Sequence, residues 1–218
     1  MEKNKTEKVK IWLQEFPQVG FGYEIRVDDP TATVADYMAA LDEFQQLNQE
    51  NCAGCSGCCW ERAPLTLPDL AKISQKFAGD SIDILSKIAE IKMDNGVVDI
   101  MLAKKEDGSC VFLDKEKSLC TQYDIRPIVC HTHTCLPHSA KAYSLRSAII
   151  NAGEDALVTR WFDDCQKREA LPLQYVNEAG IRIADYVPNV VSGKEWDQVL
   201  LVDIVPPILW QSLTKKGD

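Results

Sequence analysis

Four cysteines occur within eight residues, in the segment Cys52-Ala-Gly-Cys55-Ser-Gly-Cys58-Cys59. Every spacer is alanine, glycine or serine, and glycine allows the tight curl that lets several sulfur atoms converge on one point. Thiolate sulfur is a preferred ligand of zinc and of iron–sulfur clusters. The segment therefore predicts a metal site. The alternative is a set of buried free thiols that pack as small hydrophobic side chains, and the close spacing argues against it.

Three more cysteines follow at regular intervals, at Cys110, Cys120 and Cys130. Each stands alone among apolar or mixed neighbours, so the residues themselves leave open whether it binds metal or packs in the core. A metal held by both groups would tie distant parts of the chain together and stabilise the fold. Adjacent side chains leave the backbone in different directions, so Cys58 and Cys59 cannot easily share one small ion. One of them lies outside the ligand shell, or a multi-iron cluster accepts both.

All three histidines and a further cysteine lie within eight residues, at His131, His133, Cys135 and His138. Histidine is a common metal ligand, and these residues could form a small site or complete the cysteine centre. An extended segment would instead place His131, His133 and Cys135 together on the solvated face of a loop. Both interpretations remain open. The last cysteine, Cys165, lies on the apolar side of an expected helix and is predicted to be a core residue.

Composition and charge exclude several classes of protein. The net charge is −9, and no basic stripe compensates it, so binding to nucleic acid is disfavoured. No apolar run reaches the length of a signal peptide or a membrane span, which predicts a cytoplasmic protein without membrane contact. In a reducing compartment, nine clustered thiols more often hold metal than form disulfides.

Local signals predict the elements that position these residues. Thr33 and Thr66 each precede an aspartate by three positions, as in a helix-capping box, and each opens an amphipathic pattern. The predicted helices span 33 to about 48–51, 66–79, 81 to about 93, 139–151 and 154–170. Strands are expected at 97–102 and 110–113, forming a hairpin that presents Cys110 at a strand start. The tail is expected to be extended, with a buried strand within 199–205.

The cysteine pattern resembles the CxxCxxCC family, which includes the YkgJ-type bacterial proteins described as zinc- or iron-chelating. The resemblance spans about Asn51 to Cys130, and its matching residues are Cys52, Cys55, Cys58, Cys59, Cys110-Val-Phe-Leu113 and Cys120-Thr-Gln-Tyr123-Asp-Ile-Arg126-Pro127-Ile-Val-Cys130. It implies a metal or iron–sulfur centre, and it favours Cys120 and Cys130 as ligands over Cys110. A guanidinium at Arg126 would offset the negative charge of such a centre, although an ordinary surface ion pair is the alternative.

The choice of metal depends on how many ligands the spacing provides. Structural zinc sites are usually built from two C-x-x-C pairs, and the second pair is missing here. One tight run joined by a remote cysteine is closer to the loops that hold [4Fe–4S] clusters, so this cofactor is expected, with zinc as the alternative. The preferred ligands are Cys52, Cys55, Cys59 and Cys130, with Cys58, Cys110 and Cys120 as substitutes.

The expected fold is α+β, mainly helical with a small β-hairpin, organised around a cysteine-ligated metal centre. The expected division is an N-terminal helical segment at 1–50, a cysteine-cluster domain at 51–138, and a helical and extended segment at 139–218 that packs on the same domain. Two functions follow from a metal centre: a redox or enzymatic protein, or a chelating structural or metal-carrier module. Either would act on a protein or small-molecule partner that the sequence does not identify, and an enzymatic activity stays undecided.

Overall fold

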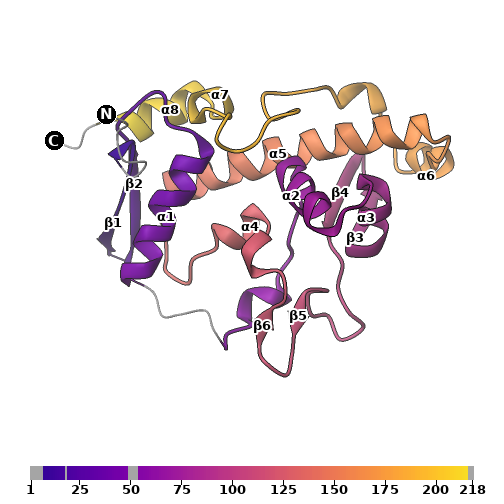
Figure 1. Ribbon diagram of the computed structural model, residues 1–218. Coiled ribbons are helices and arrows are strands. Elements are labelled where there is room, and N and C mark those ends of the chain that lie inside the picture. The colour runs from indigo at the N-terminus through magenta and orange to yellow at the C-terminus, as the bar shows by residue number, and fades with distance from the viewer. Residues whose placement is uncertain (1–6, 18, 49–53, 216–218) are drawn as a thin grey trace. The chain divides into compact units, whose positions relative to one another are not determined.

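A computed structural model describes residues 7–17, 19–48 and 54–215 (Figure 1). The architecture is α+β: helices are combined with three separate two-stranded antiparallel sheets. The chain forms two compact units. The N-terminal unit comprises 1–51, 132–151 and 194–218, and the cysteine-bearing unit comprises 52–131 and 152–193. Within the described residues, no helix combines the length and the apolar character that a membrane crossing requires.

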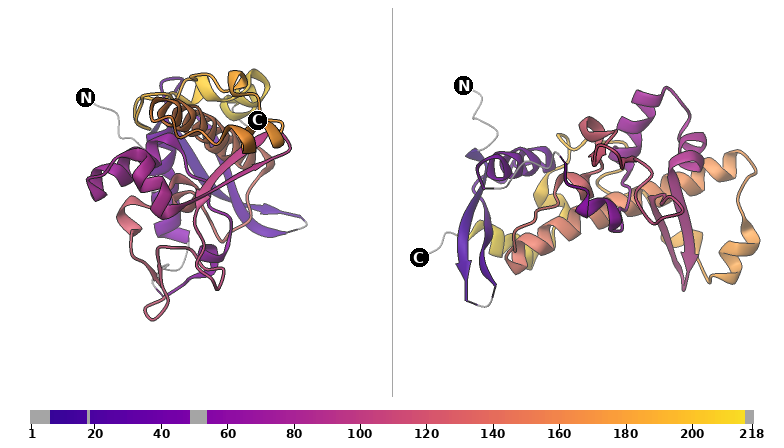
Figure 2. Two further views of the ribbon diagram at one scale, coloured as in Figure 1. Left: turned by 90° about the vertical axis from the view of Figure 1, so that its right-hand side faces the viewer. Right: turned by 90° about the horizontal axis from the view of Figure 1, so that it is seen from below.

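The N-terminal unit is built on a hairpin that the sequence did not predict. Strand β1 (Val9–Phe16) pairs antiparallel with β2 (Gly20–Val27), and helix α1 (Val34–Asn48) packs on them (Figure 2). Two short C-terminal helices, α7 (Leu201–Ile204) and α8 (Pro207–Thr214), complete this unit. The predicted buried strand at 199–205 is therefore wrong, although Leu201 is fully buried. Helix α7 takes up this short apolar run, whose pattern does not separate strand from helix.

Helix α1 begins where the sequence predicted, because its capping box forms. The backbone N–H of Thr33 donates to Asp36 Oδ2 at 2.9 Å, and the Asp36 N–H donates to Thr33 Oγ1 at 3.2 Å. These bonds satisfy amides that a helix start otherwise leaves without partners. The Lys8 ammonium also lies 3.3 Å from Asp36.

The cysteine-bearing unit contains the remaining short elements. They are the 3-10 turn η2 (Gly57–Trp60), α2 (Leu67–Phe77), α3 (Ser81–Ile88), β3 (Ala89–Asp94), β4 (Val97–Leu102), β5 (Leu113–Asp114), β6 (Leu119–Cys120), the 3-10 turn η3 (Tyr123–Ile125), α4 (Ile128–His131), α6 (Leu173–Glu178) and the 3-10 turn η4 (Ile183–Asp185). Helix α5 (Ala140–Lys167) contributes its second half. The predicted pair of helices at 139–151 and 154–170 is thus a single helix, because Ala152 and Gly153 continue it rather than break it.

Two hairpins replace the one that the sequence predicted. The helix expected at 81–93 ends at Ile88, and residues 89–94 form β3, which pairs with β4. Asn95 and Gly96 join these strands with φ of 49° and 83°, the left-handed conformation of a two-residue hairpin turn. Strand β4 therefore does not pair with 110–113. Instead Leu113 pairs with Cys120 in the β5–β6 hairpin, and Cys110 forms an isolated bridge with Lys104.

Candidate metal centre

Cysteines from separate stretches of the cysteine-bearing unit are held together by backbone hydrogen bonds. The N–H of Cys110 donates to the carbonyl of Cys59 at 2.8 Å, and the N–H of Leu113 donates to the carbonyl of Cys110 at 3.0 Å. Leu113 in turn pairs with Cys120 across the β5–β6 hairpin. The turn η2 and the hairpin are therefore joined at residues that carry thiols or adjoin them.

The raised pKa values of Cys59 and Cys130 indicate which cysteines lie near one another. Burial, together with a smaller effect of nearby Cys58, Cys110 and Cys120, raises the pKa of Cys59 to about 12, because like charges would repel. Burial also raises the pKa of Cys130, and Cys58, Cys110 and Cys120 add to it in the same way. These five thiols, Cys58, Cys59, Cys110, Cys120 and Cys130, are called the thiol cluster below.

The thiol cluster lies against the apolar core of its unit. Cys110 is itself buried in that core, and Cys59, Cys120 and Cys130 pack on it while remaining partly accessible. Of the preferred ligands, Cys52 lies outside the described residues and Cys55 is exposed. A ligand role for these two cysteines therefore stays a prediction. Cys165 is buried in the same core, as the helical pattern predicted.

The described part of the chain does not contain a ready-made ion-binding arrangement. No three cysteine, histidine or carboxylate side chains within 7–17, 19–48 and 54–215 are disposed around one point so as to hold a metal ion. The thiols affect each other's pKa without meeting at the close spacing that a single tetrahedral ion imposes. The organisation of the fold around a metal centre therefore stays a proposal.

A buried carboxylate fixes the turn that carries Cys130. Asp69 Oδ2 accepts hydrogen bonds from Thr66 N at 3.1 Å and Thr66 Oγ1 at 2.6 Å, which is the capping box predicted for α2. Its other oxygen, Oδ1, accepts from the N–H of Ile128 at 2.9 Å. Burial raises the pKa of Asp69 to about 6, against the opposing effect of these donors. One carboxylate thus caps α2 and anchors the start of α4.

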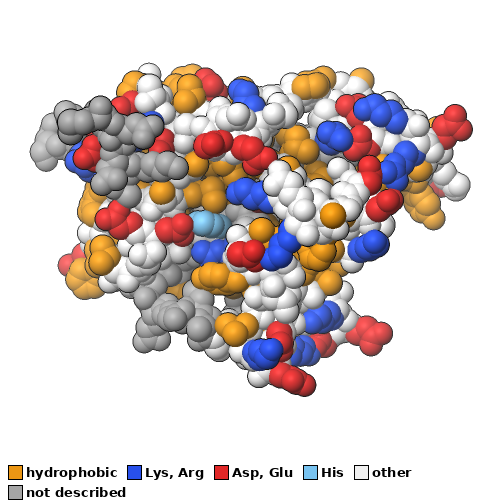
Figure 3. Space-filling view, viewed as in Figure 1, with side chains coloured by type: hydrophobic (Ala, Val, Ile, Leu, Met, Phe, Trp, Pro, Cys, Tyr) orange, Lys and Arg blue, Asp and Glu red, His pale blue; other side chains and the backbone are white. Residues whose placement is uncertain are grey.

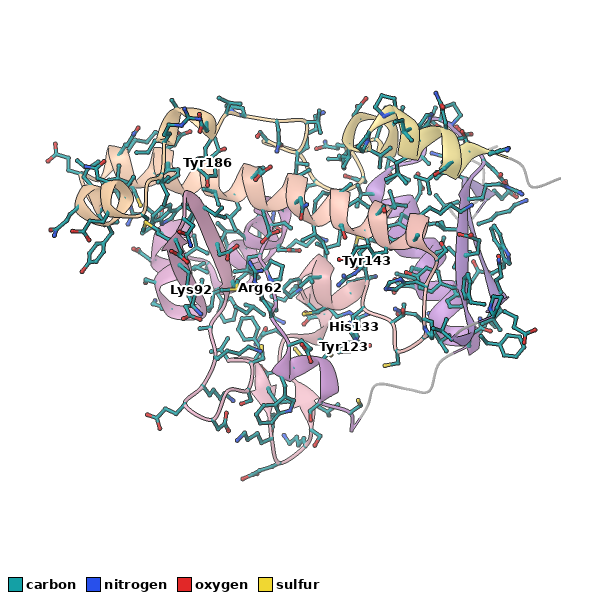
Figure 4. The ribbon with its side chains drawn as sticks, turned by 180° about the vertical axis from the view of Figure 1, so that it is seen from behind. Arg62, Lys92, Tyr123, His133, Tyr143 and Tyr186 are labelled. Atoms are coloured by element: carbon teal, nitrogen blue, oxygen red, sulfur yellow. The ribbon has the colours of Figure 1, made fainter. Side chains whose placement is uncertain are left out.

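Arg126 and Pro127 act on the thiol cluster in two ways. The guanidinium of Arg126 stacks over the ring of Tyr123 at 4.4 Å (Figure 4) and lowers the pKa of Cys120, opposing the larger effect of burial. That Arg126 offsets the charge of a metal centre stays a prediction. The carbonyl of Pro127 accepts the N–H of Cys130 at 2.9 Å, so the proline sets the turn in which that thiol lies.

The outer surface of the hairpin is charged but balanced. Lys115 lies 5.7 Å from the centroid of the Trp60 ring and pairs with Asp107. Figure 3 shows basic and acidic side chains intermixed at the lower end of the molecule, where Figure 1 places β5 and β6. Trp60 itself is 47% exposed, so it covers the neighbouring sulfur atoms only in part.

The histidines divide between the two units. His131 ends α4 in the cysteine-bearing unit, whereas His133, Cys135 and His138 belong to the N-terminal unit. The ring of His138 stacks on Tyr143 at 5.5 Å. Gln45 donates to the carbonyl of His133 at 2.9 Å. Packing therefore accounts for His138, and a ligand role for the others remains a hypothesis.

A second set of charged groups lies on β4 and the second half of α5. Arg62 pairs with Asp99 and donates from Nε to the sulfur of Met101 at 2.8 Å (Figure 4). The pKa of Glu154 is raised to about 7, mainly by burial with a smaller effect of Asp99, and Arg62 opposes this rise. Glu154 therefore changes charge near neutral pH.

Sequence comparison places these residues in a family. Residues 51–158 match the family model named CxxCxxCC and described as "Putative zinc- or iron-chelating domain", and this part of the chain belongs to that family. The thiol cluster lies within the matched residues. Metal binding through cysteine is therefore the property that the family and the donor chemistry share.

One curated protein gives a partial match. A stretch of 80 residues is 31% identical to the uncharacterized protein MJ0661 of Methanocaldococcus jannaschii, covering 37% of this chain and 41% of that protein. The match thus spans about two fifths of the length of this relative. No solved structure matches the chain.

Several residues that position the thiol cluster were not identified from the sequence. The capping box at Thr66 and Asp69 was predicted, but no pattern indicates that Asp69 also binds Ile128, which is 59 positions away. Lys104 carried no signal of its own. The side chain of Lys104 reaches the thiol cluster because the loop folds back and forms the backbone bridge between Lys104 and Cys110.

Proposed function

We propose that this protein binds iron through its cysteines as a [4Fe–4S] cluster and uses it in a redox or enzymatic role. The observation that carries the proposal is the thiol cluster, in which five cysteines lie near one another and four of them, Cys59, Cys110, Cys120 and Cys130, lie in or against one core. Thiolates at such a site would repel each other without a bound cation. Metal binding would offset this repulsion.

The spacing of the cysteines along the sequence supports a centre larger than one ion. Structural zinc sites are usually built from two C-x-x-C pairs, which hold four sulfur atoms at about 2.3 Å from the metal. The chain has one tight cysteine run, at 52–59, and the remaining candidates are single cysteines far along the sequence. A cluster of several iron atoms separates its ligands more widely and can accept sulfur from neighbouring positions.

The residues proposed to hold the cluster are drawn from Cys58, Cys59, Cys110, Cys120 and Cys130, together with Cys52 and Cys55 of the same motif. When bound, the cluster would supply electron transfer or an iron open to substrate. The protein's own contribution would be partial burial, since Cys59, Cys120 and Cys130 pack on apolar side chains, and the positive charge of Arg126 near Cys120. A reducing compartment such as the cytoplasm would keep these thiols available.

A zinc- or iron-chelating module is the second candidate, and the family description favours it. In that case the metal would stabilise the fold, and the protein would act through a partner or carry the metal. Either function requires a protein or small-molecule partner.

Anaerobic purification separates the two candidates. The first predicts a coloured protein with visible charge-transfer absorbance, iron and acid-labile sulfide in about equal amounts, and little zinc. A colourless protein with stoichiometric zinc would refute it and support the second. Replacing Cys130 by Ser should remove the absorbance. The matched control is Cys165→Ala, a thiol buried in the apolar core, which should retain it.

A further inference from the structure

The carbonyl groups beside the Cys58–Cys59 turn receive a lysine ammonium. Lys104 Nζ donates to the carbonyl of Cys59 at 3.2 Å and to the carbonyl of Glu61 at 2.5 Å. The same Cys59 carbonyl also accepts the N–H of Cys110 at 2.8 Å. Lys104, in the loop that precedes Cys110, thus donates hydrogen bonds to the carbonyls at the end of η2.

The loop that carries Lys104 is itself closed on Cys110. Lys104 and Cys110 form an isolated antiparallel bridge, and within the loop the N–H of Lys105 donates to the carbonyl of Ser109 at 2.7 Å. The ammonium therefore has a fixed starting point beside Cys110 and reaches across to η2. It connects two segments that each contribute to the thiol cluster.

An ammonium suits this place for two physical reasons. Carbonyl groups at the end of a helical turn carry partial negative charge, so they attract cations. The Cys59 carbonyl already accepts the N–H of Cys110, and the ammonium bonds to its second lone pair. A centre of several thiolates has net negative charge, which a nearby lysine offsets. Lys104 is half-buried and Glu61 is exposed, so water can replace the ammonium at the Glu61 carbonyl.

We propose that Lys104 is a positioning residue of the metal centre, holding the Cys58–Cys59 turn against Cys110 so that their sulfur atoms can serve one centre. This inference rests on the proposed metal-binding function. It assigns no contact between Lys104 and the metal. The lysine acts through the backbone carbonyls of Cys59 and Glu61 and through its charge.

Three variants separate this role from a general effect of charge or fold. Lys104→Met keeps the length of the side chain and removes the donor and the charge. Lys104→Arg keeps both and offers several donors to the two carbonyls. The matched control is Lys92→Met, because Lys92 is an exposed lysine of β3 in the same unit that pairs with Glu90 on its own strand (Figure 4).

The test is anaerobic titration of the metal-free, reduced protein with Co²⁺, followed by its thiolate charge-transfer and d–d absorbance, with a competing chelator to fix affinity. Lys104→Met should bind Co²⁺ about tenfold more weakly, the lower end of losses seen when residues that orient ligands are changed. Its d–d bands should shift, because the sulfur geometry changes. Lys104→Arg should stay within about threefold of the wild type, and Lys92→Met should match it. Circular dichroism should be the same for all four proteins.

Two results would overturn the inference. One is a Lys104→Met variant with wild-type affinity and spectrum. The other is an equal loss in Lys92→Met or in Lys104→Arg, since neither change removes the donor to Cys59 and Glu61. Failure of metal binding by the thiolates looks different, because the wild-type protein would then show no thiolate–Co²⁺ bands at all, and the iron and sulfide analysis described above tests the [4Fe–4S] cluster separately.

Discussion

Replacing Glu154 by Gln should change how stability depends on pH. The pKa of Glu154 is raised from 4.5 to about 7, mainly by burial and to a smaller extent by Asp99 and Asp155, against the opposing charge of Arg62. Folding therefore favours the protonated carboxyl. Its favourable contribution is complete below about pH 4.5 and is lost as the pH rises through about 7. Gln has no charge to bury, so the variant should avoid this loss.

The size of the effect follows from the two pKa values. A rise from 4.5 to about 7 corresponds to about 3.4 kcal/mol at about 1.36 kcal/mol per pKa unit. Glu154 is only partly buried, so solvent screens part of that energy. We expect Glu154→Gln to be more stable than the wild type by about 1–3 kcal/mol at pH 8 and equal to it near pH 4.5. Arg62 keeps its pairing with Asp99 in the variant, so no cation is left alone.

The measurement is urea denaturation of both proteins at several pH values between 4.5 and 8. The quantity compared is the difference in unfolding free energy at each pH, because any pH dependence of metal binding is common to both proteins and cancels. Glu106→Gln is a suitable control, since Glu106 is exposed in the loop after Lys105. A difference between wild type and Glu154→Gln that stays constant across this range would refute the reasoning.

Four further substitutions test other parts of the structure. A Cβ at Gly22 would lie 2.4 Å from the carbonyl oxygen of Pro137, so Gly22→Ala should lower the unfolding free energy by about 1–3 kcal/mol in urea denaturation; an unchanged midpoint would contradict this close approach. Cys165→Ala should leave the metal content measured by elemental analysis unchanged, because that thiol lies in the apolar core, and a loss of metal would make it a ligand. Thr66→Val and Thr33→Val each remove one capping hydroxyl and should each cost about 1 kcal/mol in thermal or urea unfolding; a neutral effect at either would show that its cap contributes nothing.

Local signals predicted the start of each capped helix, because a capping box satisfies its own amides within four residues. The same reasoning failed at Asn95-Gly96, which was interpreted as a helix end. That pair is the preferred turn of a two-residue hairpin, and the residues of β3 before it alternate between half-buried and exposed, as in a strand with one face on the core. Helix α5 continues through Ala152 and Gly153, where its packing outweighs the weak local preference for a break.

The thiol cluster shows where sequence stops being informative. Spacing identified the four cysteines of 52–59 as ligand candidates and left Cys110, Cys120 and Cys130 open, and the resemblance favoured Cys120 and Cys130. No local pattern indicates that the backbone N–H of Cys110 donates to the carbonyl of Cys59, or that Lys104 donates to the same carbonyl. Both hydrogen bonds depend on a loop that folds back over more than forty residues. Charge pairs such as Arg62 with Asp99 are equally invisible until β4 is placed.

The dispersed origin of the thiol cluster also constrains how the protein is made. Cys130 follows Cys59 by 71 residues, and a ribosome adds about 5–20 residues each second. The first thiols therefore emerge about 4–14 seconds before the last one exists. During that interval the first thiols are accessible to soft metals and oxidants, and the hydrogen bond between Asp69 and Ile128 cannot yet form. Because the full set of thiols exists only once Cys130 has been added, stable metal binding would follow completion of the chain.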